Sequence, residues 1–319
     1  MSLLRLPRLP RFATLAGLLM VLAGCETAVL RQSLTPPNRP ADLPSPQTIS
    51  AQSQELAYYY GRVQSDLLTR GLLRTDGGGP DTPFDADDLA RNFETVAFYS
   101  EYASASALGS GRGTTSGTLA RWSGPVRIGL EFGVTVDGEK RQRDSQQVQA
   151  YAARLGRVSG HPINVTTGRA NFHVFVAGLD DIPVVQDQLR KLVPGIGPEQ
   201  LALFQSLPKS QYCFVFAFSD PKDIDSYSTA VALVRAEHPD LVRLSCIHEE
   251  IAQGLGLPND SPSLRPSIFN DDDEFALLTN HDEMLLKILY DPRLSPGMTI
   301  AQARPIIRTI SRELLGEPL

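Results

Sequence analysis

The sequence contains no long run of basic residues and none of the short motifs that mark nucleotide-binding or serine-hydrolase sites. Its 30 lysines and arginines are scattered among 36 aspartates and glutamates, which gives a formal net charge of −6. No broad basic surface is implied, so we do not expect nucleic acid as a partner. A G-x-S-x-G motif, a phosphate loop and a Rossmann fingerprint are all missing, which leaves serine-hydrolase and nucleotide-enzyme functions without support.

Cysteine is scarce, with three in the chain, and the first of them closes an N-terminal export signal. Basic residues precede a short apolar segment at 13–22, which is too short to span a bilayer but suits a signal peptide. The Leu-Ala-Gly-Cys sequence that ends at Cys25 is typical of a bacterial lipoprotein cleavage box. We predict a lipoprotein signal peptide over 1–25 and a lipid on Cys25 that anchors the chain to a membrane. Glu26 follows, where an Asp would resemble an inner-membrane retention signal, so we expect the outer membrane of the cell envelope.

No other hydrophobic run in the sequence is long enough to cross a bilayer. Residues 26–49 contain five prolines, which predicts a stiff, extended tether. An N-terminal helical region is expected over 50–107, because apolar residues recur at helical spacing in 51–74 and in 86–103. Asp85 is the expected N-cap of the second helix.

A larger domain is expected over 119–319, after a link at 108–118 that is rich in glycine, serine and threonine. Its first strand alternates apolar and polar residues from Val126 to Phe132. The order of the remaining elements predicts an α+β domain. The remaining predicted elements are a helix at 142–157, strands at 162–167, 171–177, 212–218 and 229–235, two short helices at 182–193 and 198–206, a helix at 240–255 and a helical pair within 280–319.

The two remaining cysteines, Cys213 and Cys246, are candidates for a disulfide. Two cysteines in an oxidising envelope compartment favour one disulfide, and both lie near the ends of predicted elements. Two buried free thiols are the alternative, because cysteine is among the most buried residue types.

The segment CIHEEIAQGLGLPND at 246–260 carries the motif that bears most directly on function. A zinc peptidase of the H-E-x-x-H type places two histidines four residues apart on one helix face. His248 and Glu249 supply the first two positions, but Ala252 occupies the place of the second histidine. In this register the segment does not encode a zinc site.

A shift of one residue gives Glu249-Glu250-x-x-Gln253-x-x-Gly256-x-x-Asn259, which keeps the metzincin spacing H-E-x-x-H-x-x-G-x-x-H. Glu249 and Gln253 lie one turn apart and therefore point from one helix face. Gly256 can adopt a positive φ and end the helix, which would bring Asn259 back toward the same point.

The sequence is similar over about residues 85–300 to the bacterial family called domain of unknown function 2927, which is associated with metzincin-like peptidases. The similarity rests on Arg121-Trp122, on the 249–260 core and on the segment 267–294. It implies a metzincin-like zincin domain, with a mixed sheet, the motif helix and a C-terminal helix. Phe269 would lie near the place of the Met-turn methionine.

The predicted ligand set departs from that of a zinc peptidase, because Glu249, Gln253 and Asn259 replace three imidazoles. Asp260 is a further, charged oxygen donor one residue away. Amide and carboxylate oxygens suit Ca²⁺ or Mg²⁺ rather than zinc. We therefore expect a non-catalytic protein that has no cofactor and that binds an envelope protein or peptide. The alternative is a metal-dependent peptidase that holds a divalent metal through these oxygens, with Glu250 as general base.

The remaining histidines and the acidic run at 270–274 are weaker candidates. His248 lies about 100° round the helix from Glu249, so the two side chains do not share a face. His281 could approach the site from the last helical segment. The histidines at 161, 173 and 238 stand alone in the sequence. The acidic run is expected to be a solvated turn or the N-terminal cap of the helix that follows.

Overall fold

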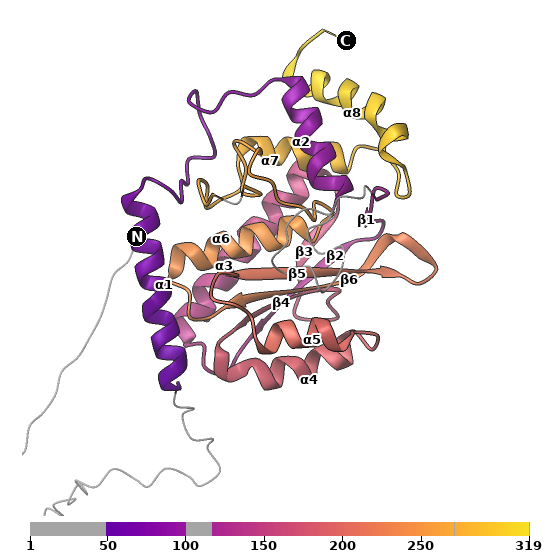
Figure 1. The fold of residues 1–319 in the computed structure, drawn as a ribbon. Helices are drawn as coiled ribbons and strands as arrows, with labels where there is room; N and C mark the ends of the chain where they lie inside the picture. The colour runs from indigo at the N-terminus through magenta and orange to yellow at the C-terminus, as the bar shows by residue number, and fades with distance from the viewer. Residues whose placement is uncertain (1–48, 100–116, 271, 319) are drawn as a thin grey trace, which may run out of the picture. The chain divides into compact units, whose positions relative to one another are not determined.

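The computed structural model describes residues 49–99, 117–270 and 272–318, in which two helices precede a region that contains both strands and helices (Figure 1). These residues all belong to one compact unit, Pro46–Leu319. Cys25, the predicted signal peptide, most of the tether and most of the link lie outside the described residues. No helix within the described ranges is both long and apolar enough to cross a membrane.

The helices and strands of the described residues follow the predicted order closely. The strands are β1 (Arg121–Trp122), β2 (Val126–Phe132), β3 (Ile163–Val165), β4 (Phe172–Ala177), β5 (Cys213–Asp220) and β6 (Asp223–Arg235). The helices are α1 (Ala51–Thr69), α2 (Ala86–Phe98), α3 (Gly138–Ser159), η1 (Leu179–Asp181), α4 (Ile182–Leu192), α5 (Pro198–Gln205), α6 (Asp240–Gln253), α7 (Asn280–Leu289) and α8 (Ile300–Leu315).

The strands form one mixed sheet in which most neighbours are parallel. Its order is β1-β6-β4-β2-β3, and β5 pairs with β6 as well. Only the β5–β6 pairing is antiparallel among the described strands. Helix α3 connects β2 to β3 and supplies the long crossover that a parallel pair requires, whereas the antiparallel strand β5 returns the chain before β6 pairs in parallel with β4.

Successive residues of β4 separate two layers of helices, since side chains alternate across a strand. Phe172, Val174 and Val176 pack in a core with residues of α3 and α6. Phe175 and Ala177 pack in a second core with residues of α4 and α5. The sheet therefore lies between α3 and α6 on one face and α4 and α5 on the other (Figure 1).

The N-terminal helices pack against the rest of the described chain. Leu89 and Phe93 of α2 belong to the same core as α3 and α6, and α2 lies beside α7 and α8. Leu67 of α1 packs with Val242 at the start of α6. Asp85 caps α2 as predicted, because its side chain accepts a hydrogen bond from the backbone N–H of Asp88 at 2.8 Å.

Several predicted boundaries differ from the structure, and tertiary contacts determine two of them. Helix α1 ends at Thr69 and not at 74, and Gly71 then has a φ of +75°. The chain turns there so that Arg74 can pair with Phe275 in a short parallel bridge. Strand β6 is longer than the predicted 229–235, because its pairing with β5 continues to Asp223.

The predicted disulfide between Cys213 and Cys246 is confirmed, with a sequence separation of 33 residues. It joins the first residue of β5 to the middle of α6. A buried ion pair holds α6 to α3 as well, because Asp144 accepts hydrogen bonds from Arg243 Nε at 2.9 Å and from Nη2 at 3.0 Å. Helix α6 is therefore fixed to elements on two sides.

Candidate functional site

Helix α6 ends with the glycine turn that its motif predicts. The last helical residue is Gln253, and Gly256 has a φ of +133°. A Cβ at Gly256 would lie 2.6 Å from the carbonyl oxygen of Ala120, so this position requires glycine for its conformation and for its close packing. Trp122 fixes the same turn, because its indole N–H donates to the carbonyl of Gly254 at 2.8 Å.

A pocket of about 380 Å³ lies beside the C-terminal half of α6. Four carboxylates belong to its polar lining, whereas no lysine, arginine or histidine occurs among the described lining residues. The carboxylates are Glu249 and Glu250 of α6, Asp260 of the turn after it and Asp273 of the loop before α7. Tyr212 and Phe275 supply aromatic surface. The pocket is therefore acidic with an aromatic border.

The structure brings four of the five predicted site residues together and places the fifth elsewhere. Glu249, Glu250, Gln253 and Asp260 line the acidic pocket. Asn259 is buried, with 6% of its surface exposed, and its side-chain amide donates to the carbonyl of Thr95 on α2 at 3.0 Å.

Asp260 takes the place at the pocket that the motif spacing assigned to Asn259. The side-chain amide of Gln253 donates to Asp260 Oδ1 at 2.7 Å. Two of the three predicted replacements for the zinc-binding histidines thus bond to groups of the protein itself.

The residues of the pocket do not fit a catalytic zinc site. Ligand atoms of Glu249, Glu250 and Cys213 lie within 4.8 Å of one another. The sulfur of Cys213 belongs to the disulfide and offers no thiolate, which is the form that binds zinc. The remaining donors are oxygens, and catalytic zinc requires three protein ligands that are mostly imidazole or thiolate. A hard cation such as Ca²⁺ suits these oxygens better.

His248 has a structural role in the core. Its Nδ1 accepts a hydrogen bond from the backbone N–H of Leu278 at 3.2 Å, and its ring stacks on Tyr151 with 3.8 Å between ring centroids. Burial, with a smaller contribution from the nearby Arg154, lowers the pKa of His248 to about 3. The imidazole is therefore neutral at physiological pH and contributes to the packing of α6.

His281 also lies away from the acidic pocket. Its Nε2 is 3.1 Å from the side-chain amide of Asn92, and the Phe84 ring packs edge-on with 4.8 Å between centroids. None of the described residues around it belongs to the pocket lining. The structure therefore does not bring His281 to the motif helix.

The acidic run before α7 does not cap that helix, because Thr279 is the N-cap. Glu274 instead accepts hydrogen bonds from Arg265 at 2.6 Å and from Arg74 at 3.1 Å. Asp273 lines the acidic pocket, so this part of the run contributes to the candidate site.

Asp282 organises the loop beside the pocket and was not among the predicted site residues. It is fully buried and accepts hydrogen bonds from Ser267 Oγ at 2.6 Å, from Ile268 N at 3.1 Å and from Thr279 N at 2.9 Å. The Thr279-x-x-Asp282 spacing is a capping-box pattern that could have indicated part of this network. The contacts to Ser267 and Ile268 come from the fold.

His173 stands alone in the sequence, but the fold gives it a side-chain partner. In the structure, His173 on β4 has its Nδ1 2.6 Å from Glu131 Oε1 on β2. This pair lines a second pocket that is distinct from the acidic one.

The site and the fold together define a mixed α/β domain whose motif helix borders an acidic pocket. A family model described as "Protein of unknown function (DUF2927)" matches residues 86–309 of the chain. The chain belongs to this family, as the sequence similarity indicated. No curated protein and no solved structure matches the chain.

Proposed function

We propose that this chain is a lipid-anchored binding protein of the bacterial cell envelope, without catalytic activity, on a metallopeptidase-like fold. One observation carries this proposal: Asn259 donates its side-chain amide to Thr95, away from the acidic pocket. A peptidase of the metzincin type needs its three ligand positions to converge on one metal. The spacing of Glu250 and Gly256 and the glycine turn support descent from such a fold.

The chemistry of the acidic pocket supports a cationic binding partner. Glu249, Glu250, Asp260 and Asp273 line it together, and Gln253 donates to one of these carboxylates. Carboxylates form strong charge-assisted hydrogen bonds with lysine and arginine. The aromatic border suits the apolar stem of such a side chain. The occupant that we propose is a lysine or arginine side chain of an envelope protein or peptide.

The proposed location rests on two independent features. The Leu-Ala-Gly-Cys box ends at Cys25, where a lipid would anchor the chain to the outer membrane. The Cys213–Cys246 disulfide fits an oxidising compartment outside the cytoplasm. Labelling of cells with radioactive palmitate, with Cys25→Ser as the control, tests this part of the proposal alone.

A metal-dependent hydrolase is the second candidate. The observation that favours it is the proximity of Glu249 and Glu250, whose oxygens lie within 4.8 Å of each other at the pocket. Glu249 and Asp260 would hold a hard divalent cation, and Glu250 would serve as general base. This candidate requires a bound metal, whereas the binding protein does not.

The binding proposal is tested by fluorescence anisotropy with the full chain in detergent. The probes are a labelled Ala-Ala-Lys-Ala-Ala peptide and the same peptide with norleucine in place of lysine. We expect saturable binding of the lysine peptide alone, weakened about tenfold in Glu249→Gln/Asp273→Asn. The control Glu55→Gln/Asp66→Asn removes two exposed carboxylates from α1 and should leave binding unchanged. Equal binding of both peptides would refute the proposal.

A further inference from the structure

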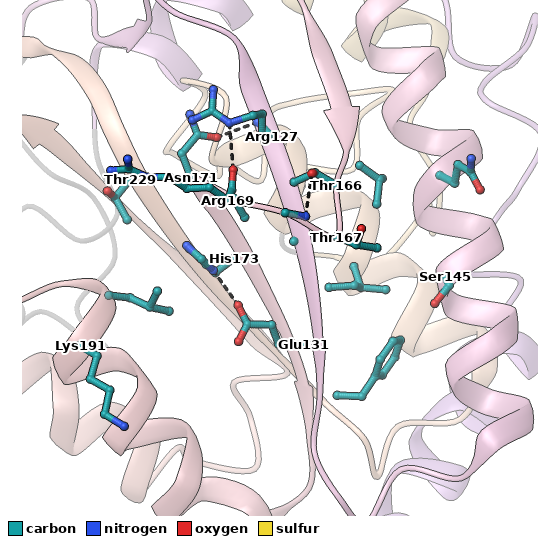
Figure 2. A pocket seen from close by; sticks show the side chains of 18 of the residues that line it. Arg127, Glu131, Ser145, Thr166, Thr167, Arg169, Asn171, His173, Lys191 and Thr229 are labelled. Carbon is teal, nitrogen blue, oxygen red and sulfur yellow. Dashed lines mark hydrogen bonds and ion pairs between the residues drawn. The ribbon is translucent and has the colours of Figure 1, made fainter.

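A second pocket, of about 910 Å³, lies along β2 beyond the short strand β3 and is lined from both helix layers, by Ser145 of α3 and by Lys191 at the end of α4 (Figure 2). The side-chain alternation of β2 explains its lining. Val126 and Ile128 face the core with α3 and α6, so Arg127, Gly129 and Glu131 face the other way. This alternation directs charged side chains of a central strand into the pocket.

The register of β2 and β4 places His173 opposite Gly129, with Glu131 two residues further along. Gly129 allows close packing here, because a Cβ at this position would lie 2.8 Å from the Cβ of Ala170. The segment between β3 and β4 can therefore approach the sheet. It brings Thr166, Thr167 and Arg169 to the rim of the pocket (Figure 2).

His173 presents one ring nitrogen to the pocket. The residue is 8% exposed, and its Nδ1 donates to the carboxylate of Glu131 at 2.6 Å. The Nδ1 is the donor because an ionised carboxylate can only accept. No residue in the described ranges bonds Nε2, which lies on the other side of the ring and away from Glu131 (Figure 2). Nε2 is therefore available to a ligand or water in the pocket.

Three cations line the same pocket: Arg127, Arg169 and Lys191. None of them forms an ion pair within the described ranges. Arg127 Nε donates to the carbonyl of Arg169 at 3.0 Å, which holds the guanidinium at the rim. Glu131 is the one carboxylate among the described lining residues. The pocket is therefore locally positive, although the whole chain has a net charge of −6.

We propose that this second pocket binds a small anionic sugar, one that carries a carboxylate or a phosphate. The cations suit the anionic group, and His173 Nε2 with the side-chain hydroxyls of Thr166, Thr167 and Thr229 suits the sugar hydroxyls. The volume fits a small molecule. Three cations are too few for the phosphate contacts of a nucleic-acid site.

The test is isothermal titration of the full chain in detergent with glucose 6-phosphate, with glucuronate and with neutral glucose. The two acids distinguish a phosphate ligand from a carboxylate ligand. We expect saturable binding of at least one acid, tighter than glucose by about tenfold or more. In Arg127→Gln/Lys191→Gln the affinity for the acid relative to that for glucose should fall about tenfold, because each change removes one charge from the pocket.

The matched control is Lys222→Gln/Arg308→Gln, which removes two exposed cations outside this pocket. Its affinity for the acids should equal that of the wild type. Absence of saturable binding by both acids would overturn the proposal, as would equal weakening by the control. The Glu249→Gln/Asp273→Asn variant should bind the acids normally, which separates this inference from the proposed function of the acidic pocket.

Discussion

Gln253 and Asp260 are joined by a hydrogen bond of 2.7 Å between the amide Nε2 and the carboxylate Oδ1. The bond links the last residue of α6 to the chain that returns after the Gly256 turn. The bond engages the side chains of two of the predicted metal-site residues with each other.

Loss of the Gln253 amide should destabilise the protein. In Gln253→Ala, the part-buried Asp260 carboxylate loses this donor, and we expect the free energy of unfolding to fall by about 1–2 kcal/mol. Urea unfolding measures this change. Gln146→Ala, an exposed position on α3, should change it by less than about 0.5 kcal/mol. Equal stabilities of the two variants would show that the bond contributes nothing.

The Arg243–Asp144 pair should be far more sensitive than an exposed ion pair. Both side chains are 1% exposed, so Asp144→Asn leaves a buried guanidinium with only the largely exposed Asp240 as a charge partner. We expect a loss of about 3–5 kcal/mol in the free energy of unfolding. Asp66→Asn breaks an exposed pair with Arg70 and should cost less than about 1 kcal/mol. Chemical denaturation of both variants compares them, and similar losses would contradict the argument.

The buried His248 should make stability depend on pH in a defined window. Burial lowers its pKa from 6.5 to about 3 in the folded state, so the unfolded state binds the extra proton between these values. Stability therefore falls as pH drops below about 6.5, by about 2 kcal/mol between pH 7 and pH 5 for this group. His238 acts in the same direction, because burial also lowers its pKa.

The variant His248→Asn keeps an acceptor for Leu278 N but removes the titrating group. From pH 7 to pH 5 the free energy of unfolding falls in both proteins, and we expect the fall in the variant to be about 2 kcal/mol smaller than in the wild type. Urea titrations at the two pH values give this difference. The same pH dependence in both proteins would exclude His248 as its source.

The disulfide should stabilise the domain mainly by lowering the conformational entropy of the unfolded chain. It closes a loop with a sequence separation of 33 residues, so removal should cost about 3–4 kcal/mol in the chain-entropy account. Cys213→Ser/Cys246→Ser measures this loss by urea unfolding. Dithiothreitol should destabilise the wild type and leave the double variant unchanged. A loss below about 1 kcal/mol would contradict the entropic account.

Local sequence patterns were sufficient to predict much of the fold. Alternation predicted β2, helical spacing predicted α3 and α6, and the cap at Asp85 was correct because these signals lie within a few residues. The end of α1 was wrong because Arg74 pairs with Phe275, which is distant in sequence. Periodicity contains no information about such a contact.

The candidate site was harder to predict because its chemistry depends on tertiary geometry. The motif spacing correctly indicated a positive φ at Gly256. It could not show that Asn259 would turn to Thr95, because α2 has no local relation to the motif. The pairing of His173 with Glu131 depends on the register of two parallel strands that a long helix separates.

The metal content of the full chain, purified in detergent without chelators and then incubated with zinc, calcium and manganese, tests the central claim most directly. The account predicts far less than one equivalent of each metal after gel filtration, in the wild type and in Glu249→Ala alike. About one equivalent of a metal in the wild type that is lost in Glu249→Ala would contradict it. That result would establish a metal centre at the acidic pocket and favour the hydrolase.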